Sequence, residues 1–141
     1  MTEPTSVGAK CLCGAVRVTF PAPPIAARTC WCRDCQVLAA GGGSNNAAFR
    51  TDGMTIEGEL RWFASVAESG RTIERGFCPN CGTHMLARAV GRTDLVMLRV
   101  GALEEQGSVA PQSVIWAASA PEWACIDPAL PRSEGQPPPI A

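Results

Sequence analysis

The stretch KCLCGAVRVTF, residues 10–20, combines the two features that decide the fold: a close pair of cysteines and an alternating apolar run. Val16, Val18 and Phe20 alternate with Arg and Thr, which is the period-2 pattern of a strand with one buried face. Cysteines two apart on a strand point to the same side, with Cα atoms about 6.7 Å apart. Side chains that lean together, helped by the turn that Gly14 permits, can bring both sulfurs to one metal ion.

Similar short apolar runs recur along the chain, with turn signals between them. The runs are ELRWFA, TIERGF, THMLARAV, LVMLRV and QSVIWA, and the turn signals are PAPP, GGGSNN at 41–46, TDG and ESG. Short strands at such spacing predict a mainly β domain. RDCQVLAA is the best helix candidate, one or two turns long and ended by the glycines at 41–43. The Pro-rich end predicts a weakly ordered tail, so we expect one domain over residues 8–127 and a tail over 128–141.

The overall composition excludes several classes of protein. The chain has 141 residues, 46% of them hydrophobic, and a formal net charge of -1. The absence of a basic surplus argues against nucleic acid or a membrane surface as partner. The first ten residues lack a signal-peptide pattern, and no uncharged apolar stretch reaches the ~20 residues of a membrane span. We expect a cytoplasmic protein, and the sequence leaves its oligomeric state open.

Seven of the eight cysteines fall into three clusters along the chain. In a reducing compartment, clustered cysteines indicate metal ligands or redox catalysts, with a disulfide framework as the alternative. The clusters are Cys11 and Cys13; Cys30, Cys32 and Cys35; and Cys78 and Cys81, while Cys125 stands alone.

The third cluster, FCPNCG at residues 77–82, has the form of a zinc knuckle. Pro79 suits the first corner of a tight turn, and Gly82 follows it. Two thiols from this turn and two from the first cluster complete a closed four-thiolate site, which is typical of structural zinc. The predicted ligands of the structural zinc are Cys11, Cys13, Cys78 and Cys81.

The middle cluster, CWCRDC at residues 30–35, offers three thiols at overlapping spacings. Three ligands leave one position of a zinc ion open, and an open position is the mark of a catalytic zinc. A small thiol bound there would lose its proton at neutral pH. We therefore predict Cys30, Cys32 and Cys35 as catalytic residues and ligands of a catalytic zinc, and two zinc ions per chain.

Two residues offer an alternative to the open position. His84 or Cys125 could fill it and make a second structural site. We expect instead that His84 is a strand histidine whose hydrogen bonds are satisfied and that Cys125 is a buried, inert thiol. Iron is the alternative metal in a four-thiolate site, although zinc is the commoner occupant.

The order CLCGAV, CWCRDC and RGFCPNCG resembles the glutathione-dependent formaldehyde-activating enzyme (GFA) family, also called the centromere-protein-V/GFA domain family. The likeness continues in GELRWFAS, VMLRVGALEE and SVIWAASAPEW, and covers about residues 8–124. The resemblance implies a β-tent of antiparallel sheets related to zinc ribbons. It also implies the same division of the cysteines into a structural and a catalytic zinc site.

Members of this family are assigned as carbon–sulfur lyases that condense formaldehyde with glutathione. The resemblance implies the same activity here: a zinc-dependent lyase that joins a small thiol, most readily glutathione, to an aldehyde such as formaldehyde, giving an S-hydroxymethyl adduct. A zinc-activated thiolate attacking a carbonyl carbon fits this chemistry. Arg33, Arg71 and Arg75 are candidate cations for the two carboxylates of glutathione. The alternative function is a non-catalytic zinc-binding interaction module with two structural zinc sites.

Overall fold

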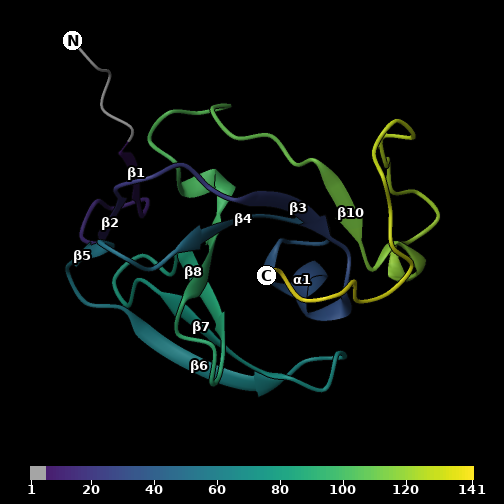
Figure 1. The fold of residues 1–141 in the computed structure, drawn as a ribbon. Helices are drawn as coiled ribbons and strands as arrows, with labels where there is room; N and C mark the ends of the chain where they lie inside the picture. The colour runs from purple at the N-terminus through teal and green to yellow at the C-terminus, as the bar shows by residue number, and fades with distance from the viewer. Residues whose placement is uncertain (1–5) are drawn as a thin grey trace, which may run out of the picture.

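The computed structural model describes residues 6–141 and is mainly β, with two sheets and one short α-helix (Figure 1). The helix is α1 (Arg33–Leu38), and two 3-10 turns, η1 and η2, lie at Val100–Ala102 and Ala117–Ser119. The strands are β1 (Val7–Lys10), β2 (Arg17–Phe20), β3 (Ala26–Cys30), β4 (Ser44–Arg50), β5 (Thr55–Glu57), β6 (Arg61–Val66), β7 (Thr72–Phe77), β8 (His84–Ala89), β9 (Leu95–Arg99) and β10 (Ser113–Ile115).

The larger sheet has seven strands in the order β10-β3-β4-β9-β8-β7-β6, and the smaller has the order β1-β2-β5. Within residues 6–141 the named strands pair antiparallel, except for the parallel pair of β10 and β3. Figure 1 shows the larger sheet bent, with β3, β4 and β10 on one side and β6 and β7 on the other. The helix and the C-terminal segment lie between these two sides. The predicted mainly β class is confirmed.

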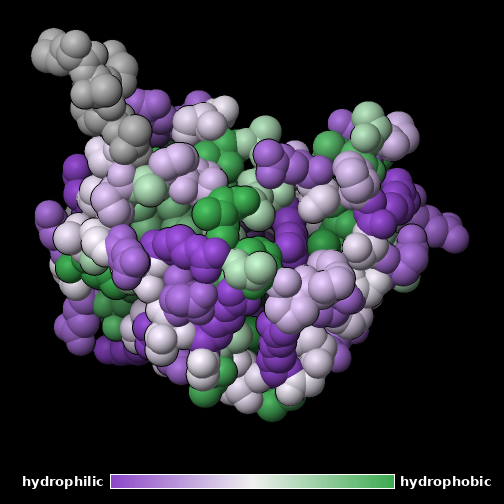
Figure 2. Space-filling model, in the orientation of Figure 1, coloured by the Kyte–Doolittle hydropathy of each residue, from purple (hydrophilic) through white to green (hydrophobic). Residues whose placement is uncertain are grey.

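The hydrophobic core joins the two sheets. Val18 and Phe20 of β2 are fully buried, as the alternation predicts, and they belong to one cluster with Leu86 and Leu98 of the larger sheet. The ring of Phe20 stacks on Phe49 of β4 with centroids 3.9 Å apart. Burying each such side chain contributes about 1.5–3 kcal/mol to folding. On the face in Figure 2, apolar side chains form small patches between hydrophilic ones.

The first cysteine pair lies in a turn and not on a strand. β1 ends at Lys10, and the Gly14 N–H donates to the carbonyl of Cys11 at 3.1 Å. Gly14 has a φ of +81°, which glycine adopts without steric cost. The strand predicted from this stretch is therefore divided, and β2 starts only at Arg17.

In two further segments, the local sequence pattern predicts the helix correctly but predicts a turn that is too long. The helix predicted from RDCQVLAA is confirmed as α1, which has six residues. Within residues 6–141, no helix has the length and apolar character needed to cross a membrane. The turn predicted for GGGSNN is shorter than expected, because β4 already begins at Ser44. Asn45 lies opposite Thr29 of β3, whose hydroxyl donates to the Asn45 side chain at 2.6 Å. Pairing with a neighbouring strand thus outweighs the low β-propensity of Asn.

Residues 128–141 fold back onto the domain. The backbone N–H groups of Val114 and Ala117 donate to the carbonyls of Pro131 and Ser133, at 2.9 and 3.0 Å. In Figure 1 this segment runs back from the η2 end of the molecule toward the centre of the view, and the Arg50 guanidinium at the end of β4 donates to the Ala141 carbonyl at 2.6 Å. The boundary at residue 127 and the weak order of the tail stay predictions.

Candidate metal centres and the adjoining cavity

The four-cysteine cluster, formed by Cys11, Cys13, Cys78 and Cys81, brings together two distant turns. Its four sulfurs lie within 4.8 Å of one another. The Cys11 and Cys13 sulfurs are 3.6 Å apart, and those of Cys13 and Cys78 are 3.8 Å apart. Sulfurs on a tetrahedral zinc ion lie about 3.8 Å apart, given Zn–S bonds of about 2.3 Å. The donor set therefore fits a zinc ion, which would link the β1–β2 turn to the β7–β8 turn.

The β7–β8 turn has the knuckle form that the sequence predicts. The Gly82 N–H donates to the Cys78 carbonyl at 2.8 Å, and Gly82 has a φ of +78°. A hydrogen bond of 3.1 Å joins the Cys81 sulfur to the Thr83 hydroxyl. This bond, more than any other contact, lowers the pKa of Cys81 to about 5. The contact with Thr83 therefore stabilises the thiolate form of Cys81, which is the form that a metal needs.

Nitrogen donors also reach the two sulfurs of the β1–β2 turn. The Val16 N–H donates to the Cys11 sulfur at 3.2 Å, and the Asn80 side-chain amide donates to the Cys13 sulfur at 3.2 Å. Hydrogen bonds of this kind favour thiolates and orient metal ligands. Asn80 comes from the opposite turn, so it ties the two turns together.

The three-cysteine cluster lies where β3 passes into α1. Cys30 ends the strand, Cys32 caps the helix, and Cys35 sits in the first helical turn. All three are buried, and their sulfurs lie within 4.8 Å of one another. In the part of the chain that the structure describes, no other Cys, His, Asp or Glu joins this group. The cluster thus offers three soft donors that a single metal ion could share, as the sequence predicts.

Gln36 fixes the loop that carries these thiols. Its side-chain amide donates to the Trp31 carbonyl at 2.8 Å and to the Ser119 carbonyl at 3.0 Å, and its oxygen accepts a bond from the Arg33 guanidinium. Gln36 is only 5% exposed, so these bonds satisfy a buried amide. Sequence analysis did not identify this role, and its only local signal is the position next to Cys35.

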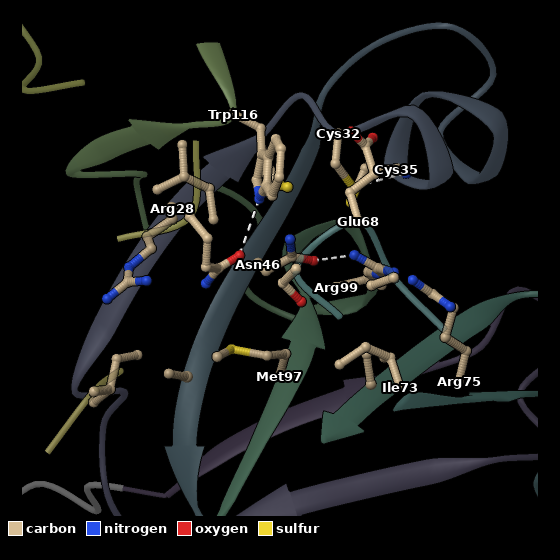
Figure 3. Close-up of a pocket in the computed structure, with 18 of the residues that line it drawn as sticks. Arg28, Cys32, Cys35, Asn46, Glu68, Ile73, Arg75, Met97, Arg99 and Trp116 are labelled. Carbon is tan, nitrogen blue, oxygen red and sulfur yellow. Dashed lines mark hydrogen bonds between the residues drawn. The ribbon is translucent and has the colours of Figure 1, made fainter. Parts of the chain in front are cut away.

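A cavity of about 160 Å³ opens beside the three sulfurs (Figure 3). Figure 3 shows the guanidinium groups of Arg75 and Arg99 close to each other on one side of this cavity, and Arg28 on the other. Hydrogen bonds with Cys30 and then Cys32 lower the pKa of Cys35, while hydrogen bonds with Cys32 and Cys35 raise the pKa of Cys30. Cys35 is therefore the member of the cluster that favours the thiolate form, and Arg75, Arg99 and Glu68 line the cavity beside it.

Arg75 is the most buried of the arginines beside this cavity. Its guanidinium donates to the Ser65 hydroxyl at 2.8 Å and lies 3.6 Å from the Asp34 carboxylate, but its Nε is buried without a partner. Of the three cations proposed from the sequence, Arg75 lines this cavity and Arg71 lines a neighbouring one. Arg33 lines neither cavity, and its guanidinium donates a hydrogen bond to Gln36.

Arg99 and Arg28 are candidate site residues that sequence analysis missed. Arg99 donates to the Asn46 side chain and, through its Nε, to His84 Nδ1 at 3.2 Å. Asn46 and Arg99 are register partners on β4 and β9, far apart in the sequence. No local motif marks such a pair.

The predictions for the two residues proposed as alternative ligands have different outcomes. His84 begins β8 and accepts a hydrogen bond from Arg99, so the prediction of a strand histidine with satisfied hydrogen bonds is confirmed. The prediction that Cys125 is buried is wrong, because it is exposed in the loops that follow η2. Neither residue belongs to a cysteine cluster in the described chain.

His84 is expected to make stability depend on pH. Burial first, and then the positive charges of Arg99 and Arg75, lower its pKa from 6.5 to about 4. The unfolded chain therefore binds this proton first, so stability is full above pH 6.5 and is lost as pH falls toward 4. Because His84 is partly exposed, we expect a loss on the order of 1 kcal/mol between pH 7 and pH 5.

Urea denaturation of the zinc-loaded protein at several pH values, compared with that of His84→Gln, measures how much His84 contributes to the pH dependence of the free energy of unfolding. The cysteines titrate in both proteins, so the difference between the two curves isolates His84. Parallel curves from pH 7 to 5 would show that the histidine contributes nothing.

The fold and the two cysteine clusters define a small, mainly β protein with two places that can hold metal ions. A family model described as glutathione-dependent formaldehyde-activating enzyme matches residues 6–119. The match spans most of the chain, so the protein belongs to the GFA family. A comparison with curated proteins gave no match.

A solved structure supports the same fold. The chain is similar to a Rhodobacter sphaeroides protein seen in a crystal structure, with 20% sequence identity and a TM-score of 0.53. The likeness covers 74% of this chain and 91% of that chain. At this identity it shows the fold alone. The family resemblance predicted from the three cysteine motifs is confirmed by the family match.

Proposed function

We propose that the protein is a zinc-dependent carbon–sulfur lyase that joins a small thiol, most readily glutathione, to an aldehyde such as formaldehyde, and that it works in the cytoplasm. The observation that carries this proposal is the three-cysteine cluster at the wall of a cavity, with no fourth donor from the described chain. Membership of the GFA family supports the same reaction. The eight cysteines are all free thiols, which suits a reducing compartment.

The donor chemistry of the two clusters supports the roles assigned to them. Cys11, Cys13, Cys78 and Cys81 would hold a structural zinc ion, because four thiolates complete its coordination. Cys30, Cys32 and Cys35 would hold the catalytic one. When bound there, zinc supplies a Lewis acid that lowers the pKa of a substrate thiol.

The reaction adds a thiol across a carbonyl group. The C–S bond forms, the π bond of the C=O group breaks, and the oxygen takes up the proton that the sulfur has lost. The carbonyl oxygen becomes negative as the bond forms, so preorganised cationic donors accelerate the step. Arg75 can fill this role, since its buried Nε–H has no partner and its side chain lines the cavity.

The walls of the cavity help to exclude water from the reacting groups. Ile73, Met97 and Trp116 line it beside the arginines (Figure 3). Charge interactions between the arginines and an anionic substrate strengthen when water is excluded. The alternative function, a non-catalytic zinc-binding interaction module, needs a fourth ligand from the chain to close the second site. The exposed position of Cys125 and the pairing of His84 with Arg99 favour the enzyme.

Metal content and its response to thiols test the proposal. We expect two zinc ions per chain in the reduced protein, one of which mild chelation with EDTA removes. Glutathione should slow this removal, because its thiol would add a fourth sulfur donor to those of Cys30, Cys32 and Cys35. S-methylglutathione, which has no free thiol, serves as the matched control and should leave the rate unchanged.

If both ions resist chelation equally and no thiol changes the release of either, the catalytic assignment fails. The activity assay follows the S-hydroxymethyl adduct and must exceed the uncatalysed reaction of thiol with aldehyde measured in the same buffer.

A further inference from the structure

A second, smaller cavity adjoins the cavity of the three-cysteine cluster. Its volume is about 70 Å³, and we call it the outer pocket. The residues that line both cavities are Arg28, Ala87, Met97, Gln136 and Ile140. The two cavities therefore adjoin each other along these five residues.

The outer pocket is lined by four arginines and, within residues 6–141, by no acidic residue. Two of the four, Arg88 and Arg92, form ion pairs outside it with Glu74 and Asp94, at 3.2 and 3.0 Å. The other two, Arg28 and Arg71, have no acidic partner in the described chain. In Figure 3, Arg28 extends away from the cysteines on the side opposite Arg75. The pocket thus holds unneutralised positive charge at a distance from the reacting groups.

The chain end forms part of the wall of this pocket. Gln136, Pro139 and Ile140 line it, and we call residues 136–141 the C-terminal strap. The strap is tied down at both ends. Trp116 Nε1 donates to Gln136 Oε1 at 2.9 Å, and the Arg50 guanidinium donates to the Ala141 carbonyl at 2.6 Å.

The strap also has the composition of a stiff element. Three consecutive prolines, residues 137–139, restrict the backbone between its two attachment points. The family match ends at residue 119, so the strap lies outside the matched residues.

We propose that the outer pocket binds one of the carboxylates of the thiol substrate while the sulfur lies at the three-cysteine cluster. This inference rests on the proposed function and specifies its substrate as a thiol with carboxylates several bonds from the sulfur. A cavity of about 160 Å³ is smaller than the roughly 300–1,000 Å³ that larger ligands occupy, so a tripeptide thiol must extend beyond it. The outer pocket is the adjoining space, and guanidinium groups bind carboxylates with two parallel hydrogen bonds.

Glutathione and its diethyl ester are the matched probes, because both carry the thiol and only glutathione carries the two carboxylates. Calorimetric titration of the zinc-loaded protein should show tighter binding of glutathione than of the ester. Arg71→Gln should weaken glutathione binding about 5- to 10-fold and leave ester binding unchanged. The double variant Arg28→Gln/Arg71→Gln should remove the preference for glutathione.

Arg61→Gln is the matched control, since Arg61 is exposed on β6 and lines neither cavity. It removes one positive charge and should keep the wild-type preference. Equal binding of glutathione and ester by the wild type, or an unchanged preference in the double variant, overturns the outer-pocket inference but leaves the proposed function intact. If neither thiol binds to the wild type, the proposed function itself fails.

A full-length strap variant tests the part that the chain end plays. Gln136→Ala/Ile140→Ser should weaken glutathione binding several-fold, because the ion pairs between the outer-pocket arginines and the substrate carboxylate become more exposed to water. Thermal unfolding of the same sample checks that the domain stays folded. Wild-type affinity for glutathione in this variant would exclude the strap from the binding site.

Discussion

Replacing Cys78 with serine is expected to abolish cooperative folding of the chain. Cys78 is fully buried and belongs to the main core cluster as well as to the four-cysteine cluster. Serine is a poor ligand for zinc, and structural zinc sites supply about 10–16 kcal/mol of apparent binding free energy that stabilises the fold. A domain of this kind has a total stability of only about 5–15 kcal/mol. Circular dichroism during heating should therefore show no sharp transition in Cys78→Ser.

Two controls separate loss of the metal from the cost of a buried hydroxyl. Cys125→Ser makes the same chemical change at an exposed site and should keep wild-type stability within about 0.5 kcal/mol. Wild-type protein stripped of both metals should lose its transition as Cys78→Ser does. A Cys78→Ser protein with native thermal stability would contradict the structural role of this cluster.

The parts of the fold that sequence predicts well are those determined by neighbouring residues. The alternation of Val18 and Phe20 identifies the buried face of β2, because side chains two apart on a strand share one face. The FCPNCG turn is equally local, since Pro and Gly restrict its backbone directly. The three thiols of CWCRDC lie within six residues, so short-range geometry is enough to bring them together.

The parts that sequence analysis missed depend on contacts between distant segments. Arg99 reaches the cavity because β9 pairs with β4 in one particular register, and no pattern near Arg99 specifies that register. Arg28 and Gln136 face a common space only after the chain end folds back beside Trp116. The prediction that Cys125 is buried failed for the same reason, because burial depends on which side chains pack against a segment. Its neighbours Ala124 and Ile126 pack against the cluster around Trp31, while Cys125 itself is exposed.

The two cysteine clusters are expected to respond differently to mutation because they occupy different places in the fold. The four-cysteine cluster contributes Cys11 and Cys78 to the core that joins the two sheets. Within residues 6–141, the partly buried apolar side chains packed against the three-cysteine cluster are Ile115 and Trp116, and the cluster lies at the wall of the cavity. Replacing a cysteine of the four-cysteine cluster should therefore prevent folding, whereas replacing one of the three-cysteine cluster should abolish activity.

Cys32→Ser is expected to abolish the activity while the fold is retained. Cys32 is the N-cap of α1, and its sulfur accepts a hydrogen bond from the Cys35 N–H at 3.4 Å. Serine is among the best N-cap residues, so it can keep this bond while it removes one of three thiolates. We expect the zinc content to fall from two ions to one per chain. The catalysed rate should fall at least about 100-fold, because even loss of a residue that hydrogen-bonds to a metal ligand often lowers metal affinity or activity 10- to 100-fold.

Zinc analysis, initial rates above the uncatalysed reaction and thermal unfolding, each compared with Cys125→Ser, measure the three effects. A Cys32→Ser protein that keeps two zinc ions and its full rate, or one that fails to fold, would show that the three-cysteine cluster is not a separate catalytic site.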